Sequence, residues 1–545
     1  MTQLIIDRDT GELFISLKLD NRVEEIKPWH SEAEDVYYFF LPSCVHDRRL
    51  YFDNIAEDDL YLDHNVISRF GSLQWEQNQI YTIEIGNMSY QVTFMRSEQI
   101  PSLFIETESG SLEALHADKE HEETGTLTVV ADNGHVQYSG SLDKISGRGN
   151  TTWEYVYKKP YAIKLKEAYP LCGLDTNRSW DLLALYYEQD KIHSKIIYDM
   201  ARKIGLDSTP QCTWVDLYCA GEYRGLYLLT EDLAGDYKNV RGGVLIEREG
   251  ADRLEESEKY FKTEVGEFIF KFREPGCPNE EQLNTTSRFI QNIEDSVISD
   301  NGNYKKCIDI KSLARAYLID KITINIDAYR FSTFYYIDND KLYAGPMWDY
   351  DLAMGEIVPD YELPIASIPS EMALWYNVFY DDSDFYDEMV SAYKELIPYL
   401  TWVLQEGIDE YAELISASVA MDSVLMNATD RTDYSVSYAK WESYIKYLKF
   451  FLANRLNYLN DLWEINTESY DIPDSTGQYH TVVYILENGD EIGEQKILDG
   501  EGIGTLPELD PELYQGWFFQ SMSKRYNYKI PIYEDIALYA KPLKK

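Results

Sequence analysis

The chain has 545 residues, 44% of them hydrophobic, so it can bury several cores, and its length predicts three or four domains. It carries 95 acidic against 50 basic side chains, which gives a formal net charge of −45. A field of this sign repels polyanions, so the composition argues against a nucleic-acid partner.

The six cysteines form no CxxC pair, which argues against a zinc ribbon and against a disulfide-dense scaffold. No apolar run reaches the roughly 18 residues that a membrane-spanning helix needs, so we expect no transmembrane segment. The first residues, MTQLIIDRDTGELF, carry acidic side chains where a signal peptide needs basic residues and an apolar core. Two alternatives remain, a cytoplasmic protein or a chain that begins after a removed leader.

Residues 1–120 are dominated by short strand-like patterns. The segments LFISLKL, VYYFFL, YTIEIG and YQVTFM alternate or run apolar over lengths suited to strands, with Gly, Asn and Asp between them. We predict a β-rich, sandwich-like domain there, and we find no catalytic constellation in it.

Residues 121–465 change to a mixed α and β pattern. TLTVVADNG, YAIKLK and GVLIERE are typical of strands, whereas residues 192–205 have helical apolar spacing and a glycine stop at Gly205. Further helical patterns cover residues 312–329 and, most clearly amphipathic, residues 441–463. The pattern predicts an α+β domain.

Residues 476–545 return to strand-like patterns and resemble a bacterial surface β-grasp repeat of the Listeria–Bacteroides type. The resemblance rests on a first strand followed by ENGD, a Gly shortly before a Pro, a GW pair and a closing LYA. Such repeats are typical of secreted or wall-attached proteins, so the resemblance implies an extracellular or cell-surface location and possible attachment to the cell wall. The alternative is a generic small β domain.

A glycine-rich element carries the first chemical signal. SGRGNTTW, residues 146–153, places Gly147 and Gly149 one residue apart and then Asn150, so that backbone amides can approach an anion closely. Arg148 adds a guanidinium that suits phosphate oxygens. In the strand that follows, Lys164 sits as the phosphate-pairing lysine of protein kinases does. Taken alone, such a pattern is usually only a turn.

Six elements in order resemble the CotH kinase family. They are GRGNTTW, KKPYAIKLK, WDLLA, a helix ending in a hydrophobic residue and Gly, GEYRGLYLLTE, and WDYDLAMG, and together they cover roughly 230 residues. The resemblance implies an atypical protein-kinase-like domain that uses ATP with Mg²⁺ or Mn²⁺ and has a protein acceptor.

The WDYD segment contains two candidate metal ligands, Asp349 and Asp351. It resembles the kinase DFG element in place and role. We expect one of the two to be the direct magnesium ligand, and the spacing does not say which. The other reading is that one of them caps the helix that follows.

Asp327, at the end of the apolar run ITIN, resembles the catalytic-loop aspartate of the family. A carboxylate there would accept or orient the acceptor proton. Kinases place a metal-binding Asn five residues later, whereas this chain has Ser332, which puts the second-metal geometry in doubt.

Lys159, Glu231 and Glu247 also fall at family-like positions. The two glutamates are candidates for adenine-side contacts or for pairing with Lys164, or else ordinary strand carboxylates. Asp190 and His193 are interpreted as polar residues at a helix start. The helix lacks an evident kinase-type glutamate.

The sequence thus predicts transfer of the ATP γ-phosphoryl group to Ser or Thr hydroxyls of a protein acceptor. In this prediction Lys164 and Arg148 hold phosphates, Asp327 acts on the acceptor, and Asp349 or Asp351 holds the metal. The alternatives are an inactive kinase-like adhesin or scaffold and the transfer of AMP in place of phosphate.

Overall fold

The computed structural model describes residues 2–543 apart from several internal stretches. These are residues 7–11, 21, 53–59, 68–70, 234–242, 255–256, 300–301, 356–373, 430–437, 472–478, 499–501, 504–505, 512, 520–524, 527–531 and 533–534. Among the described helices, none combines the length and the apolar character needed to cross a membrane.

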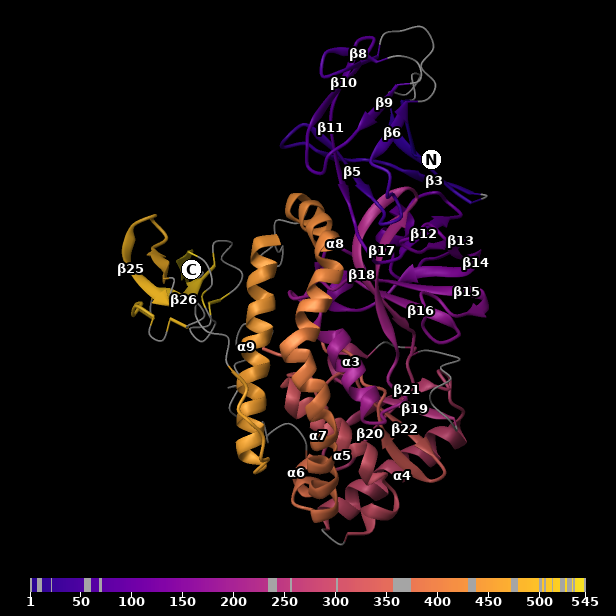
Figure 1. Ribbon diagram of the computed structural model, residues 1–545. Helices are drawn as coiled ribbons and strands as arrows, with labels where there is room; N and C mark the ends of the chain where they lie inside the picture. Colours follow the sequence, from indigo (N-terminus) through magenta and orange to yellow (C-terminus); the bar gives the residue numbers. More distant parts are fainter. Residues whose placement is uncertain are drawn as a thin grey trace.

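The first part of the chain forms two β-sheets that share one core (Figure 1). Their strand orders are β3-β2-β1-β6-β9 and β4-β5-β11-β10-β7-β8. The strands are β1 (Thr2–Ile6), β2 (Leu13–Leu19), β3 (Arg22–Ile26), β4 (Trp29–Ser31), β5 (Val36–Leu41), β6 (Arg49–Phe52), β7 (Leu60–Leu62), β8 (Asn65–Ile67), β9 (Ser72–Gln74), β10 (Tyr81–Ile85) and β11 (Met88–Arg96). Alternate residues of β2 are buried, as expected of a strand with one face on a core.

Seven strands, in the order β12-β13-β14-β15-β16-β18-β17, form a closed barrel. They are β12 (Ser102–Thr107), β13 (Glu122–Val130), β14 (Val136–Gly147), β15 (Tyr161–Tyr169), β16 (Asn177–Leu183), β17 (Cys212–Cys219) and β18 (Glu222–Glu231). The parallel pairing of β12 with β17 closes the barrel around an apolar interior that includes Trp180 and Leu229. The barrel includes residues on both sides of the boundary predicted at residue 120, because β12 precedes it and pairs with β13.

Another five-stranded sheet, in the order β20-β21-β19-β22-β23, and a group of helices follow the barrel (Figure 1). Its strands are β19 (Val244–Glu249), β20 (Tyr260–Lys262), β21 (Ile269–Glu274), β22 (Thr333–Asp338) and β23 (Lys341–Ala344). The α-helices among the described residues are α1 (Glu113–Ala117), α2 (Thr151–Tyr155), α3 (His193–Lys203), α4 (Glu280–Ile298), α5 (Ile310–Thr323), α6 (Leu374–Tyr380), α7 (Ser383–Trp402), α8 (Ile408–Thr429) and α9 (Tyr438–Leu462). The helices predicted over residues 192–205 and 441–463 are confirmed as α3 and α9.

The helix predicted over residues 312–329 is shorter than expected. α5 begins where the Asp309 side chain accepts a hydrogen bond from Ser312 N, and it ends at Ile324, which has a left-handed φ of 51°. A β-branched residue in this conformation terminates the helix ladder. As a result, Asp327 lies in a loop, where its carboxylate is not confined to one face of a helix.

A buried ion pair joins the barrel to α8. Lys158 Nζ lies 2.7 Å from Asp422 Oδ1 and donates to the carbonyl oxygen of Leu226 at 2.6 Å. Burial lowers the pKa of Lys158, and the Asp422 charge opposes that shift. The KKPY segment therefore fixes the barrel against the helical part of the chain.

The C-terminal strands form a separate four-stranded sheet. They are β24 (Tyr479–Ile485), β25 (Glu491–Leu498), β26 (Tyr514–Phe518) and β27 (Ile536–Pro542), in the order β25-β24-β27-β26 with β24 parallel to β27. Figure 1 shows this sheet beyond α9 from the barrel. Its kinship with surface β-grasp repeats stays a prediction.

Candidate active site

Two loops bring three aspartates together. Asp327 lies between α5 and β22, and Asp349 and Asp351 follow β23. Burial raises the pKa of Asp327, and the charge of Asp349 raises it further. Burial, followed by the charges of Asp349 and Asp327, raises the pKa of Asp351 well above its ordinary value. Such coupling requires carboxylates that lie close together, so the two loops form one acidic site.

The backbone of these loops is held by neighbouring side chains. Asn325 Oδ1 accepts a hydrogen bond from Asp327 N at 3.0 Å, and the buried Tyr350 donates from its hydroxyl to Asp320 Oδ1 at 2.6 Å. Asp349 has a left-handed φ of 62°, a conformation that persists in non-glycine residues where the surroundings impose it. Because Asp349 is left-handed, the segment is not an extended strand, and strand alternation does not decide between Asp349 and Asp351. Which of them binds metal stays open.

The glycine-rich element contacts the WDYD segment through Arg148. The Arg148 guanidinium carbon lies 5.5 Å from the centre of the Trp348 ring, and Trp348 in turn stacks on Tyr198. Arg148 Nε lies 3.1 Å from Asp181 Oδ1. Two motifs that are 200 residues apart in sequence therefore meet at one place in the fold, as the resemblance implies.

The structure requires glycine at the two positions of this element for different reasons. A Cβ on Gly147 would lie 2.5 Å from the Trp153 ring, so Gly147 is required for the packing of that indole. Our expectation that Gly147 serves a close approach to phosphate is thus not supported. Gly149 has a φ of 77°, which fits the predicted positive-φ turn, and a Cβ there would make only an ordinary contact with Pro160 Cγ at 3.6 Å. Asn150 is exposed and does not cap α2 with its side chain.

Sequence reasoning missed Asp181, the buried partner of Arg148. Burial raises its pKa to about 7, the Asp232 charge also raises it, and Arg148 and Arg273 oppose the shift. It lies within the WDLLA element, but our sequence reasoning gave this carboxylate no role. The pairing of β16 with β15 places Asp181 beside the glycine-rich turn, within 3.1 Å of Arg148 Nε.

Lys164 and Glu231 cannot pair with each other. Lys164 stands opposite Ser179 in the ladder, and Glu231 stands opposite Trp180. Directly opposed residues share a face and consecutive residues alternate, so Lys164 and Glu231 point to opposite faces of the barrel wall. Glu231 instead accepts a hydrogen bond from the backbone nitrogen of Gln211.

Lys164 does lie on the face that carries the site. It is a diagonal neighbour of Asp181, which stands opposite Ala162 in the same pair of strands. Within the described part of the chain, no carboxylate lies at ion-pair distance from Lys164, so its ammonium is available to an anion.

The charged groups of Glu247 and Lys159 are engaged by other residues. Glu247 Oε2 lies 2.6 Å from Arg273 Nε and 3.3 Å from Lys271 Nζ, so its pairing with Lys164 is also wrong. Lys159 donates to the carbonyl oxygen of Trp153 and lies over that ring. Burial lowers the pKa of Lys159. Neither side chain is offered to a nucleotide in this arrangement.

Ser332 lies beside the site, in the wall of a small pocket. The same pocket is lined by Trp348, Tyr350 and Asn325, and Ser332 has a left-handed φ of 47°. Asn325, two residues before Asp327, is thus an amide close to the WDYD segment, a residue that our spacing argument did not consider.

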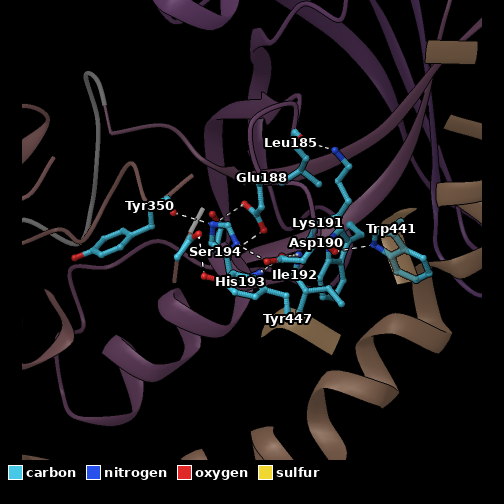
Figure 2. Close-up of polar contacts among 12 residues, drawn as sticks. Leu185, Glu188, Asp190, Lys191, Ile192, His193, Ser194, Tyr350, Trp441 and Tyr447 are labelled. Carbon is cyan, nitrogen blue, oxygen red and sulfur yellow. Dashed lines mark hydrogen bonds and ion pairs between the residues drawn. The ribbon is translucent and has the colours of Figure 1, made fainter. Parts of the chain in front are cut away.

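A buried Glu–Asp–His group adjoins the same segment. Figure 2 shows His193 between Tyr350 on one side and Glu188 and Asp190 on the other. Asp190 Oδ1 accepts from Ile192 N and His193 N, which confirms its interpretation as a helix-start residue. His193 has a further role that the sequence did not indicate, since its Nε2 donates to the carbonyl oxygen of Tyr350 at 2.9 Å.

Comparison with known families agrees with this geometry. The model of the CotH kinase protein family matches residues 145–459, more than half of the chain. The chain belongs to the CotH kinase family. No curated protein sequence gives a match. Family membership makes the chain kinase-like, a phosphotransferase of the atypical protein-kinase type, and the match includes both the glycine-rich element and the WDYD segment.

Proposed function

We propose that this CotH-family chain transfers the γ-phosphoryl group of ATP to Ser or Thr hydroxyls of a protein acceptor, with Mg²⁺ or Mn²⁺. The observation that carries the proposal is the convergence of Asp327, Asp349 and Asp351 from two loops, opposite Arg148 of the barrel. Phosphoryl transfer needs this combination, which is carboxylates for metal and acceptor and cationic donors for phosphate.

Asp349 and Asp351 are the residues we assign to the divalent cation. Carboxylate oxygens are the ligands that Mg²⁺ and Mn²⁺ prefer. The charge of Asp349 raises the pKa of both Asp327 and Asp351, and a bound cation would offset that repulsion. A divalent cation held by these carboxylates would supply positive charge that neutralises the phosphate oxygens. The same carboxylates would repel a free triphosphate, so nucleotide binding here requires metal.

Asp327 is the group we assign to the acceptor hydroxyl. Its raised pKa brings the carboxylate closer to the range in which it accepts a proton, and Arg253 and Arg330 limit the shift. Asn325 holds the backbone at Asp327, so the loop presents the carboxylate in a fixed direction. The hydroxyl proton passes to a carboxylate oxygen as the hydroxyl oxygen attacks the γ-phosphorus. The bond from that phosphorus to the β,γ-bridging oxygen breaks, and ADP leaves.

Arg148, Lys164 and the turn at Gly149 are the phosphate contacts of the proposal. Arg148 uses its Nε toward Asp181, which leaves the two terminal nitrogens for phosphate oxygens. Lys164 adds a point charge on the same face of the barrel. For Glu231, the remaining expectation is a contact with adenine. Its burial and its hydrogen bond from Gln211 N do not favour that contact.

Side-by-side labelling tests the proposal. The protein is incubated with MnCl₂, a mixed panel of Ser- and Thr-containing proteins, and ATP labelled at the γ or the α phosphorus. We expect label on protein from γ-labelled ATP alone, loss of transfer in Asp327→Asn with nucleotide affinity retained, and loss of Mn²⁺–ATP binding in Asp351→Asn or Asp349→Asn. Label from α-labelled ATP would instead establish AMP transfer. No transfer and no Mn²⁺–ATP binding would establish the scaffold alternative.

We also propose an extracellular or cell-surface location. The support is the C-terminal sheet, which is separate from the kinase-like part and has a parallel central pair of strands. Fusing residues 476–545 to a reporter and fractionating cells tests this, and a reporter that never accompanies the cell wall or the medium contradicts it.

A further inference from the structure

The Glu188 carboxylate has one oxygen that the described part of the protein leaves without a donor. Glu188 is buried, with 1% of its surface exposed, in the loop between β16 and α3. Its Oε1 accepts a hydrogen bond from Ser194 N at 3.0 Å, whereas no described residue donates to Oε2. Buried carboxylate oxygens are normally satisfied by a donor or a metal ion, so this oxygen requires a partner.

The neighbouring histidine does not provide that partner. His193 Nε2 is 3.9 Å from Glu188 Oε2, beyond hydrogen-bond distance, and it donates to the Tyr350 carbonyl oxygen at 2.9 Å instead. Its Nδ1 donates to Asp190 Oδ2 at 2.8 Å. Both ring nitrogens therefore face acceptors, and neither keeps a lone pair for a metal ion.

A metal ion held by Glu188, Asp190 and His193 together is therefore disfavoured, although their ligand atoms lie within 4.8 Å of one another. Asp190 uses Oδ1 for two backbone amides and Oδ2 for His193. Of the three residues, Glu188 alone presents an oxygen without a hydrogen bond, and that oxygen lies next to the loop that carries the WDYD aspartates.

His193 fixes the distance between Glu188 and that loop. Tyr350, whose carbonyl it binds, is the residue between Asp349 and Asp351, and Figure 2 shows Glu188 adjoining the same imidazole. The same ring nitrogen, His193 Nε2, lies 3.9 Å from Glu188 Oε2 and 2.9 Å from the Tyr350 carbonyl oxygen, so Glu188 Oε2 and the WDYD backbone adjoin one atom. Glu188 thus lies beside the segment that carries Asp349 and Asp351.

We propose that Glu188 supplies a third carboxylate to the divalent-cation site of Asp349 and Asp351, through its Oε2. This inference rests on the proposed function, since it assumes that the two aspartates hold a cation. The orphaned oxygen and the oxygen-only donor set both fit Mg²⁺ or Mn²⁺. No kinase-like motif spacing identifies Glu188, which lies before α3 and not within it.

Glu188→Gln separates a ligand from a structural carboxylate. The amide oxygen can still accept from Ser194 N, but the anionic oxygen is lost. We expect the apo melting temperature to stay the same or rise, because like-charge repulsion in the site is relieved. The dissociation constant for Mn²⁺, measured by calorimetry with MnCl₂ alone and with the ATP analogue AMP-PNP, should rise at least about tenfold. Asp216→Asn, which changes a buried carboxylate bonded to Tyr223 and Ser418, is the matched control and should leave Mn²⁺ affinity within about twofold.

A lower apo melting temperature with unchanged Mn²⁺ affinity in Glu188→Gln would overturn the inference and leave the residue a helix-start cap. Asp351→Asn, measured in parallel, distinguishes failure of the Glu188 inference from failure of the proposed function. If Asp351→Asn also leaves Mn²⁺ binding unchanged, the proposed function fails as well. The parent protein supplies a test that needs no variant. Fe²⁺ with peroxide cleaves backbone near a bound metal, and we expect cuts near Glu188 and near Asp349–Asp351. Cuts at the second position alone would also contradict the inference.

Discussion

The buried carboxylate of Asp181 should make the stability of the barrel depend on pH. Asp181 is 3% exposed, and burial raises its pKa from an ordinary 3.8 to about 7, with Arg148 opposing the shift. Between about pH 4 and pH 7, the folded protein therefore keeps a proton that the unfolded chain has released. Stability falls as pH rises wherever the folded state binds more protons, so ionised Asp181 destabilises the fold progressively across this window.

The size of the effect follows from the two pKa values. Each unit of pKa difference corresponds to about 1.4 kcal/mol. Integrating the proton difference between pH 5 and pH 7, with a folded pKa of about 7, gives a loss of roughly 2 kcal/mol over that interval. Asp181→Asn removes this dependence. It also deprives Arg148 of its partner, but Arg148 stays charged at these pH values, so that cost is a constant offset.

The assay is urea unfolding of parent and Asp181→Asn at pH 5, 6 and 7. We expect the free energy of unfolding of the variant, relative to the parent, to increase by roughly 2 kcal/mol from pH 5 to pH 7. Asp143→Asn, an exposed carboxylate on β14 paired with Arg178, is the control and should give a pH profile parallel to the parent. Parallel profiles for Asp181→Asn and the parent would refute the reasoning.

Three further variants test the packing around the site. Gly147→Ala should lower the apo melting temperature, because overpacking against Trp153 costs about 1–3 kcal/mol, and Trp153→Leu in the same chain should restore much of the loss. Asp422→Ala should destabilise the fold by about 3–5 kcal/mol, as measured by urea unfolding, because it leaves buried Lys158 unpaired, and adding Lys158→Met should recover stability. Lys164→Met should abolish Mn²⁺–ATP stabilisation in thermal melts while leaving the apo melting temperature within a few degrees; a normal nucleotide response would remove Lys164 from the site.

Local sequence patterns predicted most of the individual elements. Apolar spacing identified α3 and α9, and alternating or apolar runs identified β2, β5, β10 and β11, because these signals depend only on near neighbours. The closed barrel was not predictable in this way. Its closure depends on the pairing of β12 with β17, strands more than 100 residues apart, and no local pattern encodes such a contact.

The site was predictable in its motifs and not in its orientations. SGRGN and WDYD were located from residue types alone, and the fold brings them into contact through Arg148 and Trp348. The suggested pairing of Lys164 with Glu231 depends on strand register, which puts the two side chains on opposite faces of the barrel wall. Glu247 lies on β19 of the other sheet and pairs with Arg273. Glu188 and Asp181 were missed because burial, not residue type, makes their carboxylates unusual.

The negative charge of the whole chain and the negative charge of the site both mean that a nucleotide needs a divalent cation to bind. A protein with a formal charge of −45 repels a nucleotide triphosphate at long range, and the site adds the carboxylates of Asp327, Asp349, Asp351 and Glu188 at short range. Arg148 and Lys164 alone are too few to offset that repulsion, and Arg148 is already partly neutralised by Asp181. A divalent cation changes the sign of the local field where the phosphates must lie. The acidic site is therefore consistent with a kinase-like function only if metal binds before or together with the nucleotide, and the ordering follows from electrostatics without reference to any motif.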